Sequence, residues 1–246
     1  MKKYLLAEHL KHKRSFLKKL CVVAPLISPV AAFVLMPLYF AASAYNWWYV
    51  FLLQGTFALV AGLVHRREER NLHYRAVYCL SVDLGKVWIS KVLVASAYLL
   101  FVVVLHFLSV EILQSFVSSG LAPRYEWSTL LFGSIVLLLV NLWQAPLCLY
   151  LAKKIGFMAS LVGNTLLGAA AGILFADSPL WWFCPYAWGA RLMVPILHVL
   201  PNGLVANAAK PMIEDTSVGI PCIVSLGLYF LLIGLTARWF SAQEVE

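Results

Sequence analysis

Two groups of polar residues have the types and spacing that hydrolytic chemistry needs. The adjacent carboxylates Glu68 and Glu69 form one group, and His198 with Asn202 forms the other. A carboxylate and an imidazole within hydrogen-bond reach of one water molecule can activate that water as a nucleophile. The two groups form a single site only if the fold brings them to the same side of the molecule, so the surrounding elements decide the prediction.

Six apolar stretches, each about as long as a membrane-spanning helix, dominate the chain. Hydrophobic residues make up 62% of its 246 residues. A hydrocarbon core of about 30 Å needs roughly 20 apolar residues per helical span. The sequence therefore predicts an all-α polytopic membrane protein, with residues 1–246 as a single transmembrane domain. The predicted spans are residues 21–40, 47–64, 92–113, 129–152, 155–176 and 218–237.

Basic residues are concentrated on one side of these spans. Sixteen of the 19 Lys and Arg residues fall there, mainly in residues 1–20 and in the loop of residues 66–91. Short basic loops stay on the cytoplasmic side of a membrane, so both termini are predicted in the cytoplasm. The same topology places Glu68 inside and His198 outside, too far apart to share a water or a metal.

The composition argues against catalysis and against nucleic-acid binding by this chain. No Gly-rich loop ending in Lys and Ser or Thr is present to hold nucleotide phosphates, and the five cysteines lack metal-ligand spacing. The hydrophilic connections are too short for a soluble catalytic domain. We therefore predict a chain that is not an enzyme and binds no cofactor. Its net charge of +8 is attributed to topology and to attraction of anionic membrane lipid.

Three segments outside the predicted spans carry most of the functional information. Residues 1–20 place Leu6, Leu10, Leu17 and Leu20 at helical spacing, which predicts an amphipathic helix on the cytoplasmic membrane surface. The alternative is a short helix whose charges only set topology. Residues 177–217, on the outer side, contain several Pro and Trp residues around an apolar core too short to span the membrane. This pattern predicts a re-entrant or interfacial segment that handles an amphiphile or caps the structure.

The third segment is the cytoplasmic loop of residues 66–91, whose dense charge is typical of a surface that contacts another protein. Asp83 is predicted to cap a short helix, residues 84–88, that merges into the third span. A solvated loop without a partner is the alternative.

Aromatic and polar residues in and around the spans have ordinary structural interpretations. Seven aromatic rings are predicted to anchor the helices at the headgroup level: Tyr45, Trp47, Trp48, Tyr49 and Trp127 outside, and Trp88 and Trp239 inside. Polar side chains inside the spans are predicted to join helices by hydrogen bonds, and Pro25, Pro29 and Pro146 to kink them. The polar residues concerned are Gln54, His106, Glu111, Asn141, Gln144 and Asn164.

The order of these elements resembles the ABC-2 type permeases: an amphipathic arm, six spans, a loop between the second and third, and an outer re-entrant segment. Residues 7–16, 45–49 and 82–91 further resemble the permease subunits of lantibiotic-immunity ABC transporters, the MutE/EpiE group. The Asn-Trp-Trp-Tyr run that begins at Asn46 is the most specific element. Gln54 stands where that group has proline.

The resemblance implies a non-catalytic permease of a bacterial cell membrane exporter. ATP and Mg²⁺ would be held by a separate ATP-binding subunit in two copies, beside a second permease of similar size. The cargo would be a lantibiotic, a cationic amphiphilic peptide. The residues implied to contact the ATP-binding subunit are Glu68, Glu69, Arg70, Val82, Asp83, Leu84 and Lys86. The candidates for cargo contact are Trp47, Trp48, Trp181, Trp182, Trp188 and Glu111.

Two alternatives remain open. The same permease architecture would serve a different amphiphile, such as a drug, a lipid or a bacitracin-like antibiotic, because such pockets use the same residue types. The remote alternative is an intramembrane protease, because Glu68 and Glu69 with His198 and Asn202 resemble motifs of the CAAX-type membrane proteases. In that comparison His73 stands where the motif has Arg.

Overall fold

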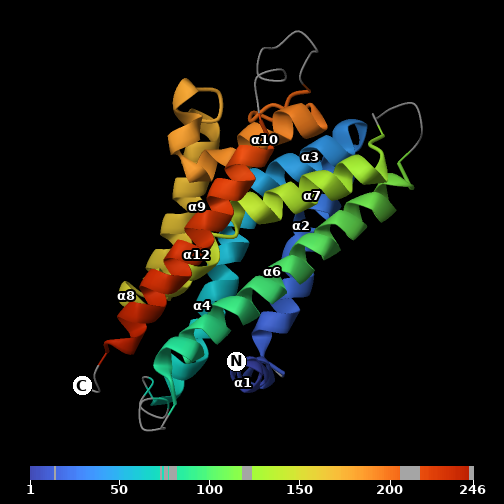
Figure 1. Cartoon of the computed structure of the whole chain (residues 1–246). Coiled ribbons are helices and arrows are strands. Elements are labelled where there is room, and N and C mark those ends of the chain that lie inside the picture. Colours follow the sequence, from blue (N-terminus) through green and yellow to red (C-terminus); the bar gives the residue numbers. More distant parts are fainter. Residues whose placement is uncertain are drawn as a thin grey trace.

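The chain folds into long apolar helices that run side by side (Figure 1). The computed structural model describes residues 1–13, 15–72, 74, 77, 82–117, 124–205 and 217–243, and the side chains of all of these except residues 70–72. Five helical segments are each long and apolar enough to cross a membrane, and a bent pair of helices forms a sixth. The six are Phe16–Leu35, Pro37–Glu69, Leu84–Gln114, Trp127–Asn141 with Gln144–Lys154, Phe157–Leu174 and Gly219–Ser241. The predicted all-α polytopic membrane protein is therefore confirmed.

The first span begins earlier than predicted, and this shortens the arm. Helix α1, Lys2–Lys11, is followed by a turn, and α2, Phe16–Leu35, already starts at Phe16. Helix α2 continues through Pro25 and Pro29 and ends where Met36 precedes Pro37, because a residue before proline disfavours the helical conformation. The predicted arm of residues 1–20 is thus a ten-residue helix plus the first turn of the first span.

The second span changes its helical geometry along its length. A short 3-10 turn, Pro37–Tyr39, leads into α3, Phe40–Trp47, then into a π-helical turn, Trp48–Leu52, and finally into α4, Leu53–Leu72. A π turn inserts one extra residue into a helix and often marks a functional position. Here it directly precedes α4, in which the buried Gln54 donates a hydrogen bond to Asn141 of α7.

The fourth span is bent, as its proline predicts. Helices α7, Trp127–Asn141, and α8, Gln144–Lys154, meet at 43°. Pro146 lacks the N–H that would bond the carbonyl of Leu142, so the helix breaks one turn before the proline.

The remaining long helices have bounds close to the predicted ones. Helix α6 covers Leu84–Gln114, α9 covers Phe157–Leu174, and α12 covers Gly219–Ser241. The predicted loop of residues 66–91 is therefore mostly helical at its two ends, in α4 and α6, and residues 73, 75–76 and 78–81 lie outside the described residues.

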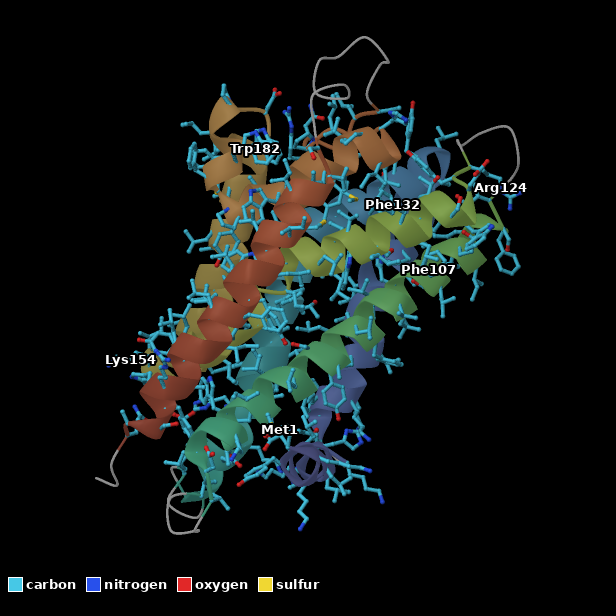
Figure 2. All side chains as sticks on the ribbon, in the orientation of Figure 1. Met1, Phe107, Arg124, Phe132, Lys154 and Trp182 are labelled. Carbon is cyan, nitrogen blue, oxygen red and sulfur yellow. The ribbon has the colours of Figure 1, made fainter. Side chains whose placement is uncertain are left out.

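The two ends of the bundle differ in charge. Helix α1 and the C-terminal end of α12 lie at one end, and α10 lies at the other (Figure 1). Met1 and Lys154 belong to the first end, whereas Arg124 and Trp182 belong to the second (Figure 2). We call the first the basal end and the second the distal end. Because most basic residues lie at the basal end, the charge asymmetry of the sequence is a property of the fold.

A short buried helix covers the distal end. Two 3-10 turns, Pro179–Phe183 and Pro185–Ala187, lead into α10, Trp188–Leu197, which packs on α7 and α9. Eight of its ten residues are buried. The prediction of an apolar element too short to span is confirmed over these residues, and residues 206–216 of the predicted segment 177–217 lie outside the described residues.

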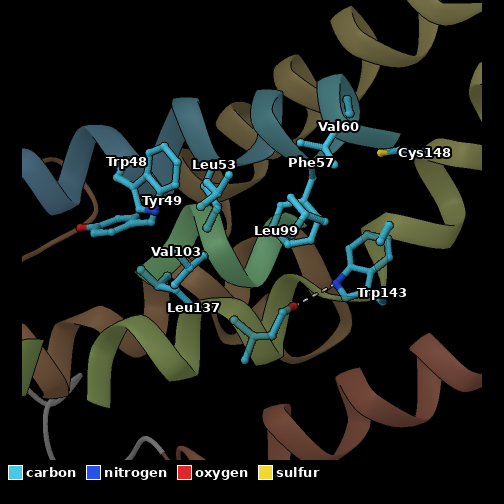
Figure 3. Packing of buried hydrophobic residues seen from close by; sticks show 14 of the residues in the cluster. Trp48, Tyr49, Leu53, Phe57, Val60, Leu99, Val103, Leu137, Trp143 and Cys148 are labelled. Carbon is cyan, nitrogen blue, oxygen red and sulfur yellow. Dashed lines mark hydrogen bonds between the residues drawn. The ribbon is translucent and has the colours of Figure 1, made fainter. Parts of the chain in front are cut away.

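The aromatic residues of the second span belong to the core. Trp48, Tyr49, Leu53 and Phe57 pack with residues of α6 and α7 in the middle of the bundle (Figure 3). Tyr45, Trp48 and Trp88 are completely buried, and Tyr49 is 2% exposed. The prediction that these four rings anchor the helices at the headgroups was wrong, because they pack against other helices instead of facing the lipid.

Candidate functional site

The basal end holds a cluster of buried ion pairs, which we call the basal cluster: Glu8, Lys11, Glu68 and Lys91. Lys91 Nζ lies 2.9 Å from Glu8 Oε1 and 2.5 Å from Glu68 Oε2. Lys11 Nζ lies 2.7 Å from Glu8 Oε2 and also pairs with Glu68. Lys91 is completely buried and Glu8 is 1% exposed. Two cations and two anions thus neutralise one another, with Lys91 and Glu8 away from water and Lys11 partly exposed. Mutual pairing is the condition under which buried charges are tolerated.

The cluster joins three helices that are distant in the sequence. Glu8 and Lys11 share one face of α1, three residues apart, and this face is turned toward the bundle. Glu68 lies near the end of α4, and Lys91 lies two turns into α6. Leu6 and Leu10 on the opposite face of α1 are exposed, so the helix presents its charges to the protein and its leucines outward. The predicted leucine stripe is divided: Leu6 and Leu10 face outward on α1, whereas Leu17 and Leu20 belong to α2 and Leu17 is buried. The polar face of α1 is the one that binds the bundle.

Burial and charge act in opposite directions on the two α1 residues. Burial favours the neutral form of Glu8, but Lys91, a hydrogen bond with His12 and Lys11 outweigh it, so the pKa of Glu8 falls well below its usual value. Burial favours neutral Lys11 as well, but Glu8 and Glu68 outweigh it and raise the pKa of Lys11 above its usual range. Both residues are therefore ionised at neutral pH.

These pKa shifts predict a stability that falls in acid. Because the pKa of Glu8 is lower in the folded chain than its ordinary value of 4.5, ionised Glu8 stabilises the fold above pH 4.5, and this contribution is lost as the pH falls further. Thermal unfolding is measured in detergent from neutral pH down to about 3. As the pH falls, Glu8→Gln should lose less stability than the wild type. Glu126→Gln, at the distal end, is the control and should follow the wild type. An equal loss of stability in acid for Glu8→Gln and the wild type would contradict the stabilising role of ionised Glu8.

A second layer of contacts closes the basal end around the cluster. The Nδ1 atom of His65 lies 2.7 Å from the hydroxyl of Tyr74, and its Nε2 atom lies 2.9 Å from Glu69. Tyr74 is buried with a left-handed backbone, φ 64°, and its ring packs edge-on against Phe240 of α12. A bulky residue in this conformation is strained unless its surroundings hold it, as the His65 contact does here. Residue 74 of the loop is therefore fixed against α4 and α12.

The start of α6 is exposed beside this packed region. The Asp83 side chain accepts a hydrogen bond from the Lys86 backbone N–H at 3.0 Å, so the predicted N-cap is confirmed. The Asp83 backbone N–H donates to the Tyr4 hydroxyl of α1 at 3.3 Å. A Cβ added to Gly85 would meet the Ser241 hydroxyl of α12 at 2.9 Å, so α12 approaches the first turn of α6 closely. Helices α1 and α12 thus fix the first turn of α6 while leaving its charged side chains in solvent.

The structure separates the residues predicted to contact an ATP-binding subunit into two groups. Asp83 and Lys86 are exposed and paired at 2.8 Å, and Val82 and Leu84 are half-buried beside them. Glu69 is partly exposed, whereas Glu68 is held in the basal cluster. The side chain of Arg70 lies outside the described residues. The exposed residues at the start of α6 therefore form one surface, and Glu68 lies beneath it.

A network of uncharged polar side chains connects the helices farther along the bundle. Asn141 Oδ1 accepts hydrogen bonds from Gln54 at 3.1 Å and from Gln144 at 2.8 Å. Asn164 donates to Gln144 Oε1 and to the Gln54 carbonyl, both at 2.8 Å, and accepts from Tyr186 at 2.7 Å. The predicted role in joining helices is confirmed for Gln54, Asn141, Gln144 and Asn164, since the network links α4, α7, α8, α9 and the turn before α10. His106 joins α6 to Ser28 of α2, whereas Glu111 accepts a hydrogen bond from Gln114 of its own helix.

The residues predicted to contact cargo lie in different environments. Trp48 is stacked on His106 with ring centroids 4.6 Å apart, deep in the core. Trp181 and Trp188 are buried at the distal end, whereas Trp182 is exposed and Trp47 is half-buried. Glu111 is partly exposed near the distal end of α6. The structure does not bring these six residues into one pocket. Exposed surface remains on three of them: Trp182, Trp47 and Glu111.

Comparison with known proteins adds no family to this geometry. No family model, no curated protein and no solved structure matches the chain. The polytopic helical architecture therefore stands on the structure itself, and the function is argued from the site.

Sequence reasoning missed the basal cluster because it counted Lys11 and Lys91 only as topology-setting charges. One signal was available: Glu8 and Glu68 are acidic residues inside strongly basic segments that flank spans. Such carboxylates are more costly to bury than lysines that reach the interface, so they need partners.

Proposed function

We propose that the chain is the membrane-spanning subunit of an ABC exporter of the ABC-2 type, placed in a bacterial membrane with its basal end in the cytoplasm. A separate ATP-binding subunit in two copies supplies the energy, and a second permease completes the transport path. The favoured cargo is a lantibiotic, and another membrane-seated amphiphile is the second candidate. The resemblance of residues 7–16, 45–49 and 82–91 to lantibiotic-immunity permeases supports this assignment.

The observation that carries the proposal is the exposed charged start of α6 above the buried basal cluster. Helix α6 contains 31 residues, about 46 Å at 1.5 Å per residue. A force applied at Asp83 or Lys86 acts on a helix that the cluster holds to α1 and α4, so it moves these elements together. This is the mechanical requirement for a subunit whose motion is driven by ATP binding elsewhere.

The far end of α6 is also fixed. Gln114 exchanges two hydrogen bonds of 3.0 Å with the Tyr125 backbone, and the Tyr125 hydroxyl donates to the Leu197 carbonyl of α10 at 2.8 Å. A displacement of α6 therefore reaches the short distal helix, next to the exposed surface of Trp182. Glu68 and His198 lie at opposite ends of the bundle, so this arrangement favours a transport subunit over a hydrolytic site made from both.

The primary test is affinity purification of the chain from its native cells in mild detergent. Recovery of an ATP-binding subunit with a second permease is expected. Recovery of the chain alone at good yield would overturn the proposal. If the exporter assembles, survival of cells exposed to a lantibiotic distinguishes this cargo from other amphiphiles.

Reversing the charge of Asp83 should weaken coupling in the assembled transporter. Asp83→Lys places a cation beside Lys86 on the exposed surface and is expected to lower cargo-stimulated ATP hydrolysis at least about tenfold, since like charges directly opposed at an interface cost several kcal/mol. The exchange Asp83→Lys with Lys86→Asp keeps the local ion pair and should recover folding but not coupling. Asp177→Lys, at the distal end, is the matched control. If both Asp83 variants keep the wild-type coupling of ATP hydrolysis to cargo, the exposed start of α6 has no part in the mechanism.

A further inference from the structure

A pocket opens at the basal end between the α1–α2 turn and α4. Its volume is about 460 Å³, and it lies next to the basal cluster without including its ion pairs. Four of its lining residues are polar or charged and three are apolar. The lining residues are His12, Ser15, Phe16, Leu17, Leu63, Arg66 and Arg67.

The N-terminus of α2 opens at this pocket without a cap. Ser15 holds the N-cap position, but its hydroxyl donates to the His12 carbonyl at 3.1 Å and makes no cap hydrogen bond. The first amide groups of a helix have no partners within the helix, and they carry a partial positive charge. The first turn contains no acidic residue, and it carries Lys18 and Lys19, which line an adjoining pocket. An anion would be stabilised by the amides and the lysines alike.

The neighbouring carboxylates are committed to other partners. Glu8 and Glu68 pair with Lys11 and Lys91, and Glu69 contacts His65. The positive charge of Arg66 and Arg67, with that of the α2 terminus, is therefore not balanced by these acidic residues.

His12 provides an independent indication of a ligand. Its side chain is 1% exposed, and Nε2 lies 3.4 Å from Glu8 Oε1, so the carboxylate accepts from the Nε2–H group. The Nδ1 atom has no hydrogen-bond partner among the described residues. In the neutral ring this nitrogen is an acceptor, and buried polar atoms are nearly always paired. A hydroxyl group of a bound molecule would satisfy it.

The apolar part of the pocket continues onto the outer surface of α2. Phe16 is 65% exposed at the mouth of the pocket. Exposed apolar residues follow it at intervals of seven, four, three and four along one helical face: Val23, Ile27, Val30 and Val34. This stripe runs from the basal end toward the middle of the bundle, where acyl chains lie in a membrane.

We propose that this pocket binds the headgroup of an anionic phospholipid that carries a free hydroxyl, as phosphatidylglycerol does. The phosphate lies at the N-terminus of α2 and is contacted by Arg66 and Arg67, the headgroup hydroxyl donates to His12 Nδ1, and an acyl chain lies along the α2 stripe. Arginine guanidinium groups and helix N-termini are both suited to phosphate oxygens. The proposal depends on membrane insertion and not on the transport function.

The test is a lipid titration of the purified, delipidated protein in neutral detergent, followed by native mass spectrometry. Phosphatidylglycerol is expected to bind at least about tenfold more tightly than phosphatidylcholine, since each basic contact contributes about 1 kcal/mol. Arg66→Gln with Arg67→Gln should lower the affinity for phosphatidylglycerol at least about tenfold. Lys2→Gln with Lys3→Gln, which removes the same charge from the exposed start of α1, is the control and should bind as the wild type does.

The Arg66 guanidinium also lies 5.3 Å from the centre of the Phe157 ring, so its removal could affect folding as well as lipid binding. A second pair of substitutions separates these two effects. Lys18→Gln with Lys19→Gln leaves that contact intact and should weaken phosphatidylglycerol binding in the same direction. Equal binding of the two lipids would overturn the proposal, and so would wild-type affinity in both the arginine and the lysine double variants. Binding of soluble glycerol 1-phosphate as tightly as the lipid would also overturn it, because the site would then recognise a free phosphate ester.

Discussion

Lys91→Met lowers the free energy of unfolding by about 3–5 kcal/mol, the usual effect of removing one member of a buried ion pair. Among the described residues, Lys91 is the only completely buried cation that lies within 3 Å of both Glu8 and Glu68. Without it, two carboxylates remain in a region largely shielded from water. The partly exposed Lys11 is then their remaining lysine partner, and His12 contacts Glu8 alone, at 3.4 Å. Thermal unfolding of the purified protein in detergent measures the loss.

Lys86→Met is the matched control, because Lys86 lies on the same helix and its pair with Asp83 is exposed. Exposed pairs contribute at most about 1 kcal/mol, so this variant should stay close to the wild type. Adding Glu8→Gln and Glu68→Gln to Lys91→Met removes the uncompensated charges and should recover part of the stability. If Lys91→Met is no worse than Lys86→Met, the basal cluster does not stabilise the fold.

Gly168→Ala is expected to destabilise the protein by about 1–3 kcal/mol through overpacking. A Cβ at this position would lie 2.5 Å from Gln54 Cγ and 3.0 Å from Gln54 Cβ and Cδ. The stem of Gln54 cannot retreat freely, because its amide donates to Asn141 and its backbone carbonyl accepts from Asn164. The substitution therefore disturbs both the contact between α4 and α9 and the polar network.

Gly163→Ala provides the control on the same helix, since a Cβ there meets nothing within 4 Å. Alanine is the better helix former, so this variant should be neutral or slightly more stable. The double variant Gly168→Ala with Gln54→Ala tests the mechanism, because it removes Gln54 Cγ and Cδ and leaves only the 3.0 Å contact with Cβ. Its destabilisation should be smaller than the sum of the single effects. Strict additivity would show that the clash is not the cause.

The six spans could be predicted from sequence because membrane insertion depends on local apolar composition. The ends of the spans were less predictable. Helix α2 starts at Phe16, within a run of lysines. Helix α4 continues through Glu68 and Glu69, where Glu68 pairs with Lys11 and Lys91 of other helices, a compensation that composition does not show.

The candidate site could be predicted only in its local parts. The Asp83 cap is a contact between neighbouring residues, and it was found. The basal cluster joins residues on three helices, and nothing in the local sequence distinguishes Lys91 from a lysine that merely marks topology. The error with Tyr45 and Trp48 has a related cause: rings that suit the headgroup region also suit contacts between helices, and composition alone does not separate the two.

The pairing of Glu8 with Lys91 also bears on how the protein is made. The two residues are 83 positions apart, so Glu8 leaves the ribosome well before its partner and must stay in water until α6 is inserted. If α6 were inserted in the opposite orientation, Lys91 would lie across the membrane, and α1 could not dock without burying an unpaired carboxylate. The ion pair thus makes docking of α1 conditional on α6 having the orientation that brings Lys91 to the basal end.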